Sequence, residues 1–269
     1  MTVSTNTIIS AAELHQRLGS NNLCIVDLRT NEAFEAGHIP GARVLTPGRL
    51  NGSAPPVGGL LPSQQEVNEI AKTIGLGSGQ TLVAYDHGAE TAAARLVWVF
   101  HAFGYTPTLW LDGGFPAWQT LSFPISQEIP PADVEAVQLQ HAGDNVIHTE
   151  ELISRLDDPA LAILDVRSRG EFDGTDVRAE RGGHIPRAQH MEWTEVFDKD
   201  GMLRDRKSLQ SEFTALGITP DKEVIVYCQT HQRSAVTYAL LKDMGYDNVR
   251  ALDGAWSDWG NRTDTPIES

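Results

Sequence analysis

The chain of 269 residues is long enough for one large domain or two of ordinary size, and its 41% of hydrophobic residues is typical of a globular protein. Its 36 acidic and 21 basic residues give a formal net charge of -15, which argues against nucleic acids and anionic membranes as partners, because both bind cationic surfaces. No apolar stretch approaches the roughly 20 residues of a membrane helix, so we expect no membrane partner.

The N-terminal residues and the cysteines indicate the compartment. The first ten residues have neither the basic nor the apolar part of a secretory signal. Two cysteines are too few for a disulfide scaffold, and no Cys or His cluster has the spacing of a zinc site. Cys24 lies within an apolar run and is predicted to be a core residue. We therefore predict a cytoplasmic protein without a metal.

Strand-like and helix-like segments alternate from the N-terminus onwards. Residues 24–29 (CIVDLR) form an apolar run of the buried-strand type, and the segment GHIPGA follows at 37–42. Apolar residues at helical spacing then end at Gly75, a residue type that often closes helices, and the β-branched run at 81–86 ends at Asp86. Strands that alternate with helices predict a doubly wound α/β domain with a parallel sheet.

The second half of the chain repeats this order. Residues 59–86 align without gaps on residues 201–228, an offset of 142. The strand and GHIP segments recur upstream, with eight extra residues before the histidine of the second copy, and LDGGFPAW recurs downstream as LDGAWSDW. The repeat is a whole domain of about 120 residues, too long for a solenoid unit. We predict an N-terminal domain at 1–124, a linker at 125–142 and a C-terminal domain at 143–269.

Cys228 stands at the junction between a predicted strand at 224–227 and a helix that begins near Ser234. In a parallel α/β sheet, ligands bind beyond the carboxyl ends of the strands. Backbone N–H groups of the loop 229–233, at the positive end of a helix, stabilise an anion carried on the sulfur, and Arg233 adds a permanent charge. The alternative is that Cys228 is a small buried hydrophobic residue.

The first copy lacks this cysteine. Asp86 takes its place, and because a carboxylate carries no sulfur and repels anions, we predict that the N-terminal domain is catalytically silent. Two other features occur in both copies, the silent one included, which indicates structural roles. His38 and His184 of the GHIP segments are predicted to be turn residues and not metal ligands. The Asp-x-Arg motifs at 27–29 and 165–167 are predicted to tie a strand end to a neighbouring loop.

Along nearly its whole length the sequence resembles the tandem-domain rhodaneses, a family of sulfurtransferases, and looks like a bacterial variety. The resemblance rests on DVR…EF followed by GHIPRA (183–188), on GMLR (201–204), on the loop after Cys228 and on LDGAWSDW. It implies two rhodanese-like α/β domains with parallel sheets and an active site in the second, where Cys228 is catalytic. The residues expected to bind the substrate are Gln229, Thr230, His231, Gln232, Arg233, Ser234 and Arg181.

The implied reaction moves a sulfane sulfur. The Cys228 thiolate attacks a small anionic donor, thiosulfate or 3-mercaptopyruvate, and the resulting persulfide passes its sulfur to a thiophilic acceptor, cyanide or a thiol. No metal or organic cofactor is implied. A donor preference for 3-mercaptopyruvate and a non-catalytic sulfur carrier or redox sensor are the alternatives. A phosphatase is disfavoured, because cysteine-dependent phosphatases use Cys-x5-Arg and this loop is Cys-x4-Arg.

The site departs in two ways from the better-known members of the family. The loop CQTHQRS is neither the basic type of mammalian thiosulfate enzymes nor the Gly-Ser-Gly type of mercaptopyruvate enzymes, which leaves the donor open. Glu171 stands where mammalian-type enzymes tend to place a substrate-binding arginine. Anion binding would then fall to Arg233, with help from Arg178 or Arg181. His231 is a candidate proton donor or polar lid.

Overall fold

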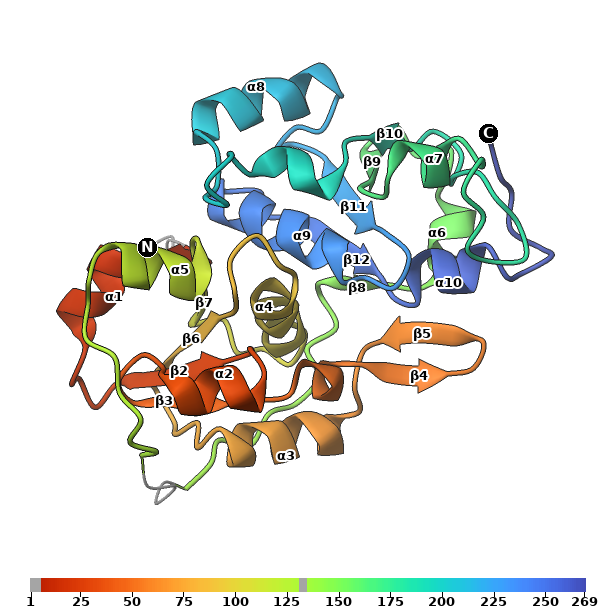
Figure 1. Ribbon diagram of the computed structural model, residues 1–269. Coiled ribbons are helices and arrows are strands. Elements are labelled where there is room, and N and C mark those ends of the chain that lie inside the picture. Colours follow the sequence, from red (N-terminus) through yellow and green to blue (C-terminus); the bar gives the residue numbers. More distant parts are fainter. Residues whose placement is uncertain (1–5, 131–134) are drawn as a thin grey trace. The chain divides into compact units, whose positions relative to one another are not determined.

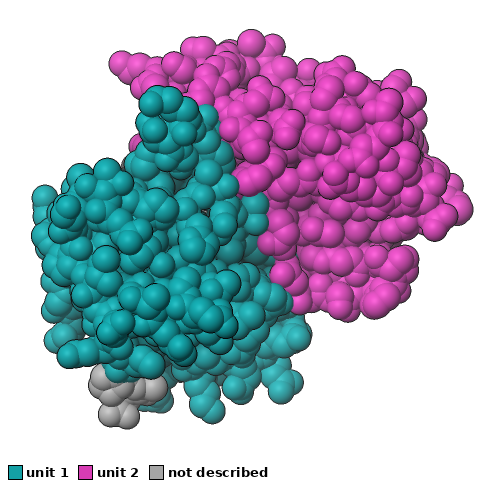
Figure 2. Space-filling model, viewed as in Figure 1, with its two compact units in different colours: residues 1–50, 62–142, 197–203 teal, residues 51–61, 143–196, 204–269 magenta. Residues whose placement is uncertain are grey.

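The computed structural model describes residues 6–130 and 135–269 (Figure 1). Positions 131–134 of the predicted linker and positions 1–5 lie outside the described residues. The chain divides into two compact units (Figure 2). Unit 1 comprises Met1–Leu50, Pro62–Ala142 and Phe197–Leu203, and unit 2 comprises Asn51–Leu61, Gly143–Val196 and Arg204–Ser269. Each unit thus combines most of one repeat with a short segment of the other, which the sequence did not predict.

Unit 1 is built on a parallel five-stranded sheet in the order β1-β7-β6-β2-β3. The strands are β1 (Ile8–Ile9), β2 (Leu23–Asp27), β3 (Ala42–Val44), β6 (Thr81–Tyr85) and β7 (Thr108–Leu111). The helices are α1 (Ala11–Arg17), α2 (Asn31–Ala36), α3 (Gln64–Thr73), α4 (Ala92–Ala102) and α5 (Gly114–Thr120), with a 3-10 turn η1 (Pro47–Leu50). Side chains of α1, α2 and α5 form one buried cluster with the strands, and α4 packs against β6 and β7.

Unit 2 repeats this architecture. Its parallel sheet has the order β10-β9-β11-β12-β8, which is that of unit 1 read from the other end. The strands are β8 (Val146–Ile147), β9 (Leu161–Asp165), β10 (Gln189–His190), β11 (Glu223–Tyr227) and β12 (Val249–Leu252). Unit 2 also contains β4 (Gly52–Ala54) and β5 (Val57–Leu60), which form a separate antiparallel hairpin. The helices are α6 (Thr149–Ser154), α7 (Arg169–Phe172), α8 (Arg206–Ala215), α9 (Arg233–Asp243) and α10 (Ala255–Trp259), with a 3-10 turn η2 (Trp193–Val196). The predicted pair of α/β domains with parallel sheets is confirmed. No helix within the two described ranges has the length and apolar character needed to cross a bilayer.

Local sequence explains where the elements begin and end. All five residues of β9 are buried, as expected for a strand with neighbours on both sides and helices over both faces. Helix α7 begins with a capping box in which Ser168 and Glu171 satisfy each other's backbone N–H groups. Gly75, the glycine predicted to close a helix, follows α3, and its repeat equivalent Gly217 follows α8; they adopt left-handed φ angles of 63° and 72°.

The features shared by both copies have the structural roles predicted for them. In the Asp-x-Arg motifs, Arg29 Nη2 donates to Gly37 O at 2.8 Å and Arg167 Nη2 donates to Gly183 O at 2.7 Å, so each arginine ties a strand end to the GHIP turn. Each GHIP histidine places Nδ1 2.9 Å from a backbone carbonyl of the preceding helix. These contacts recur in both units and therefore belong to the fold.

Each repeat contributes a short segment to the unit built mainly from the other repeat, and these two exchanged segments are equivalent in sequence position. The offset of 142 places the end of the hairpin Asn51–Leu61, in unit 2, on Phe197–Leu203, in unit 1. The N–H of the last hairpin residue donates to Asp253 Oδ1 at 2.9 Å, and the equivalent Leu203 N donates to Asp112 Oδ1 at 3.0 Å. The exchange is therefore reciprocal, with the same anchoring contact in each unit.

Candidate active site

Cys228 follows β11, the central strand of unit 2, and is fully buried. Helix α9 begins at Arg233, so four residues separate the cysteine from the helix. Two N–H groups of α10 hold the start of this loop, because Trp256 N donates to Cys228 O at 3.0 Å and Ser257 N donates to Gln229 O at 2.9 Å. Cys228 therefore lies at the carboxyl edge of the sheet, between a strand end and a helix N-terminus, where the sequence placed it.

The loop turns at His231, whose φ of 51° lies in the left-handed region. A turn of this kind brings successive backbone N–H groups to one side, an arrangement that binds anions. The His231 ring is fully buried, and its Nδ1 lies 2.6 Å from Ser234 Oγ. This contact holds the ring against the first turn of α9. The suggested roles of His231 as proton donor or lid stay predictions.

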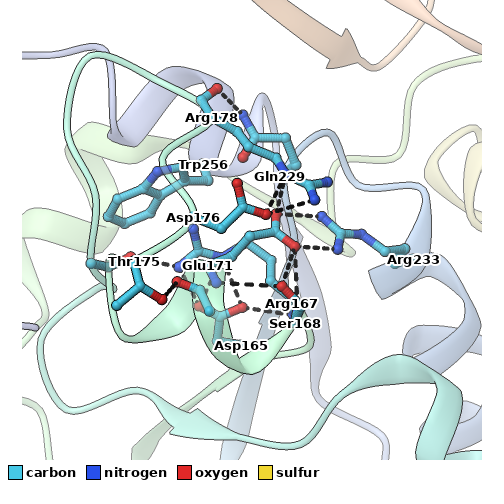
Figure 3. A network of polar contacts seen from close by, with 12 residues as sticks. Asp165, Arg167, Ser168, Glu171, Thr175, Asp176, Arg178, Gln229, Arg233 and Trp256 are labelled. Atoms are coloured by element: carbon cyan, nitrogen blue, oxygen red, sulfur yellow. Dashed lines mark hydrogen bonds and ion pairs between the residues drawn. The ribbon is translucent and has the colours of Figure 1, made fainter.

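The remaining loop side chains are engaged outside the loop. Gln229 Nε2 donates to Arg178 O at 3.0 Å (Figure 3). The Gln232 side chain donates to Asn51 Oδ1, and Thr230 lies against the β4–β5 hairpin. These contacts leave the loop backbone, and not these side chains, as the part that is suited to bind an anion.

Arg233 forms a bidentate ion pair with Glu171 (Figure 3). Its Nη1 and Nη2 lie 2.6 and 2.8 Å from the two carboxylate oxygens, and the Glu171 side chain is fully buried. Arg178 Nε lies 3.9 Å from the same carboxylate, and Arg178 is itself bound by Asp176 at 2.7 Å. The sequence indicated Arg233 as the anion-binding cation, but it did not show that a buried carboxylate holds this arginine in place.

The ion pair changes the titration of both partners. Burial raises the pKa of Glu171, but the hydrogen bonds and charge of Arg233, together with hydrogen bonds from Ser168, lower it to about 2. Burial lowers the pKa of Arg233, whereas interactions with Glu171 and with Cys228 raise it above its ordinary value. The guanidinium therefore stays charged and interacts with both the carboxylate and the sulfur.

Arg181 uses its side chain elsewhere in unit 2. Its Nη1 donates to Thr265 O at 2.9 Å and its Nη2 to Trp259 O at 3.1 Å, with a further bond to the Thr265 hydroxyl. These contacts fasten the C-terminal residues to the end of α10. The role of Arg181 in substrate binding stays a prediction, and these contacts do not support it. Arg178 and Arg181 both belong to the eight extra residues of the second copy, and of the two it is Arg178 that lies near the Glu171 carboxylate.

In unit 1 the carboxylate of Asp86 binds backbone N–H groups of the equivalent loop. Asp86 is fully buried and accepts hydrogen bonds from Gly88 N and Ala93 N, both at 3.0 Å. Ala89 has a φ of 47°, which reproduces the left-handed turn at His231. The loop has therefore kept its form, and the Asp86 carboxylate takes up N–H groups that would otherwise be open to an anion.

Both members of the ion pair are also missing from unit 1. The repeat places Thr91 at the position of Arg233, and the matching helix starts place Ala33 at the position of Glu171. Unit 1 folds into the same architecture without them. The architecture that the two units share therefore does not require this pair, which is found in the unit that carries the cysteine.

Asp86 should give unit 1 a characteristic dependence of stability on pH. Burial raises its pKa from 3.8 to about 6, against hydrogen bonds from Ala93 and Gly88 that lower it. Because the folded-state pKa is the higher one, the proton favours the folded state, and this contribution is lost as pH rises from 3.8 through about 6. Relative to wild type, Asp86→Asn should gain on the order of 3 kcal/mol of unfolding free energy over that interval in denaturant titrations. A difference that does not change with pH would contradict the raised pKa.

The comparison with known proteins places this fold and site in a family. The model of the rhodanese-like domain matches residues 10–121 and 148–262, one domain in each repeat. The chain belongs to the rhodanese family.

Relatives that align over nearly the full length of the chain narrow the class of protein to which it belongs. Thiosulfate sulfurtransferase of Azotobacter vinelandii is 37% identical and aligns with 97% of this chain and 96% of its own. The 3-mercaptopyruvate sulfurtransferase of Escherichia coli (strain K12) is 28% identical and aligns with 99% of both chains. An anaerobic ergothioneine biosynthesis enzyme from Chlorobium limicola superposes with a TM-score of 0.87 at 21% identity, over 98% of this chain and 70% of its own, which shows the fold alone. The predicted class, a tandem-domain rhodanese sulfurtransferase, is confirmed.

Proposed function

We propose that this protein is a thiosulfate sulfurtransferase that carries sulfur as a persulfide on Cys228. The observation that carries the proposal is the junction of β11 and α9, where a buried cysteine is followed by a loop that turns at His231 and where the cysteine interacts with Arg233. The identity of 37% to a thiosulfate sulfurtransferase over 97% of the chain supports thiosulfate as the donor. The donor binds the backbone of loop 229–234, with Arg233 as the cation that orients it.

In the first half-reaction the Cys228 thiolate attacks the outer sulfur of thiosulfate. A new sulfur–sulfur bond forms at Cys228, the sulfur–sulfur bond of thiosulfate breaks, and sulfite leaves with the electron pair of that bond. The enzyme then holds a persulfide whose terminal sulfur is an anion. Loop N–H groups and the N-terminus of α9 stabilise this charge without rearrangement, because they are already fixed in place.

In the second half-reaction a thiophilic acceptor removes the terminal sulfur. Cyanide or a thiolate attacks it, the bond to the Cys228 sulfur breaks, and its electrons restore the Cys228 thiolate. The products are thiocyanate or a persulfide of the acceptor thiol. We propose that the protein works in the cytoplasm, where a reducing environment keeps both of its free cysteines as thiols.

A 3-mercaptopyruvate donor is the second candidate, because the relative with that name aligns with 99% of this chain. Both donors are small anions that deliver sulfur to a cysteine, so the same loop can receive either. The ratio of kcat/KM for the two donors decides between them. A sulfur carrier or redox sensor without catalytic activity would load once and show no turnover with cyanide.

The proposal is tested by intact mass measurement. The protein is incubated with thiosulfate, freed of excess donor, and compared with untreated protein. We expect a gain of one sulfur atom that disappears on addition of cyanide with release of thiocyanate. A protein that takes up no sulfur from thiosulfate or 3-mercaptopyruvate would contradict the proposal, and release of phosphate from an aryl phosphate would indicate a phosphatase instead.

A further inference from the structure

The β4–β5 hairpin packs directly on the loop that holds Cys228. Gly59 has a φ of 70°, and a Cβ built on it would lie 2.0 Å from Thr230 O and 2.7 Å from Thr230 Cβ. The backbone of Gly59 therefore lies against the peptide of Thr230. Glycine is required here twice over, by the left-handed φ and by the close approach, and any side chain would have to displace the loop.

Two further contacts connect the hairpin with the same loop. The Gln232 side chain donates to Asn51 Oδ1 at the start of the hairpin. Ser257 links the two segments, because its N–H donates to Gln229 O at 2.9 Å and its hydroxyl accepts from Gly58 N at 3.1 Å. The hairpin thus acts on the loop at its beginning, middle and end.

These contacts involve the residues that set the conformation of the loop. Thr230 directly precedes His231, the residue with the left-handed φ, and Gln232 directly precedes Arg233 at the start of α9. A displacement of the Thr230 peptide would rotate the N–H groups that follow it away from Cys228. Such groups stabilise charge on sulfur only when they are held at close range in a fixed orientation.

We propose that the hairpin Asn51–Leu61, supplied by the first repeat, is a positioning element for the Cys228 loop, with Gly59 as its central contact. The inference rests on the proposed role of Cys228. It gives the first repeat, which has aspartate in place of the cysteine, a part in the chemistry of the second. Sulfur transfer by the Cys228 loop then depends on a segment encoded in the other repeat.

The reciprocal segment provides a matched comparison. Gly201 is the repeat equivalent of Gly59 and has a similar φ of 77°, but a Cβ there would lie 3.5 Å from Ala89 Cβ, an ordinary contact distance. Gly58, next to Gly59, would place a Cβ 3.7 Å from Thr230 Cγ2, which is also ordinary. The close approach is therefore found at Gly59 and not at these two neighbours in sequence or repeat.

The test compares Gly59→Ala with Gly201→Ala and Gly58→Ala in the full chain. Turnover with thiosulfate and cyanide gives kcat and KM, and iodoacetamide followed by peptide mass analysis gives the rate of Cys228 alkylation. We expect Gly59→Ala to lower kcat/KM by about 10-fold to 100-fold and to change the rate of Cys228 alkylation. Gly201→Ala carries the same backbone strain without the close approach, so it should lower thermal stability by less than Gly59→Ala. It and Gly58→Ala should keep the wild-type activity and alkylation rate.

Wild-type kcat/KM and alkylation in Gly59→Ala would overturn the proposal, as would an equal loss in Gly201→Ala. If Gly59→Ala does not fold, Asn51→Ala and Asn51→Asp take its place, because aspartate keeps the acceptor for Gln232 and alanine does not. A lower kcat and a changed alkylation rate in Asn51→Ala, both restored in Asn51→Asp, would support the proposal, and wild-type behaviour of Asn51→Ala would refute it. The alkylation rate does not depend on sulfur transfer, so it distinguishes failure of this inference from failure of the proposed function.

Discussion

Cys228→Ser should lower sulfur transfer from thiosulfate to cyanide to the uncatalysed rate and abolish the gain of one sulfur atom in the intact mass. A hydroxyl in place of the thiolate does not attack the donor sulfur and cannot hold it as a persulfide. Serine is nearly the same size as cysteine, so the fully buried position should tolerate it and the protein should stay folded. The measurement is the mass of the thiosulfate-treated variant, together with its steady-state rate.

Cys24→Ala is the matched control for this prediction. Cys24 lies buried in β2, where its thiol donates to Ile74 O at 3.4 Å. Burial raises the pKa of this thiol to about 12, although the charge of Arg43 opposes the shift. It should therefore remain an unreactive thiol, and the alanine variant should load sulfur like wild type. Sulfur uptake that survives in Cys228→Ser and is lost in Cys24→Ala would contradict the assignment of the carrier.

The features that the sequence predicted correctly are those expressed within short segments. The strand β11 is an apolar run, the cysteine stands at its end, and the glycine after α8 closes that helix, so each could be recognised from neighbouring residues. The two folds could be predicted because the chain carries two copies of the same pattern. Local propensity and tertiary structure agree at these positions, so a single sequence is sufficient to predict them.

The contacts that the sequence did not predict join segments far apart in the chain. Glu171 and Arg233 are 62 residues apart, and their pairing depends on how α7 meets the start of α9. Glu171 also completes the capping box of α7, a local role that hides its contact with Arg233. A comparison of the copies offers one signal, because unit 1 has lost both charges together with the cysteine.

A related reason explains why the sequence did not predict the exchange of segments between the repeats. Residues 59–86 and 201–228 align without gaps, so the sequence assigns each segment to its own copy. Nothing local distinguishes a hairpin that folds onto its own repeat from one that folds onto the other. The paired glycines Gly59 and Gly201, both with a left-handed φ, mark a special backbone position but not its neighbour.

Arg233→Gln should lower kcat/KM for thiosulfate by about 10²-fold to 10³-fold, the usual effect of removing a group that stabilises developing charge. The variant loses the only side-chain cation among the loop residues 229–234, all of which the structure describes. It also leaves the Glu171 carboxylate fully buried without its main partner. Removing one partner of a buried ion pair costs about 3–5 kcal/mol, so the variant should also be less stable at neutral pH.

The pH dependence of stability should reverse in this variant. In wild type the pKa of Glu171 falls from 4.5 to about 2, so the pair stabilises the fold above 4.5 by on the order of 3 kcal/mol and loses this contribution as pH falls toward 2. Without Arg233, burial is opposed mainly by the hydrogen bonds from Ser168, and we expect burial, the largest influence, to place the pKa of Glu171 above its ordinary value. The variant should then gain stability on acidification, because protonation removes the buried charge. Denaturant titrations at a series of pH values measure how the unfolding free energy of the wild type and of the variant changes with pH.

The double variant Arg233→Gln with Glu171→Gln separates the two roles of the arginine. Glutamine at 171 removes the buried charge, so the double variant should regain most of the stability that Arg233→Gln loses and should show no reversed pH slope. It should not regain sulfur transfer, because the cation beside Cys228 is still missing. Recovery of kcat/KM along with stability would mean that Arg233 acts only by holding the fold together, whereas recovery of stability alone assigns the arginine to the charge on donor and persulfide.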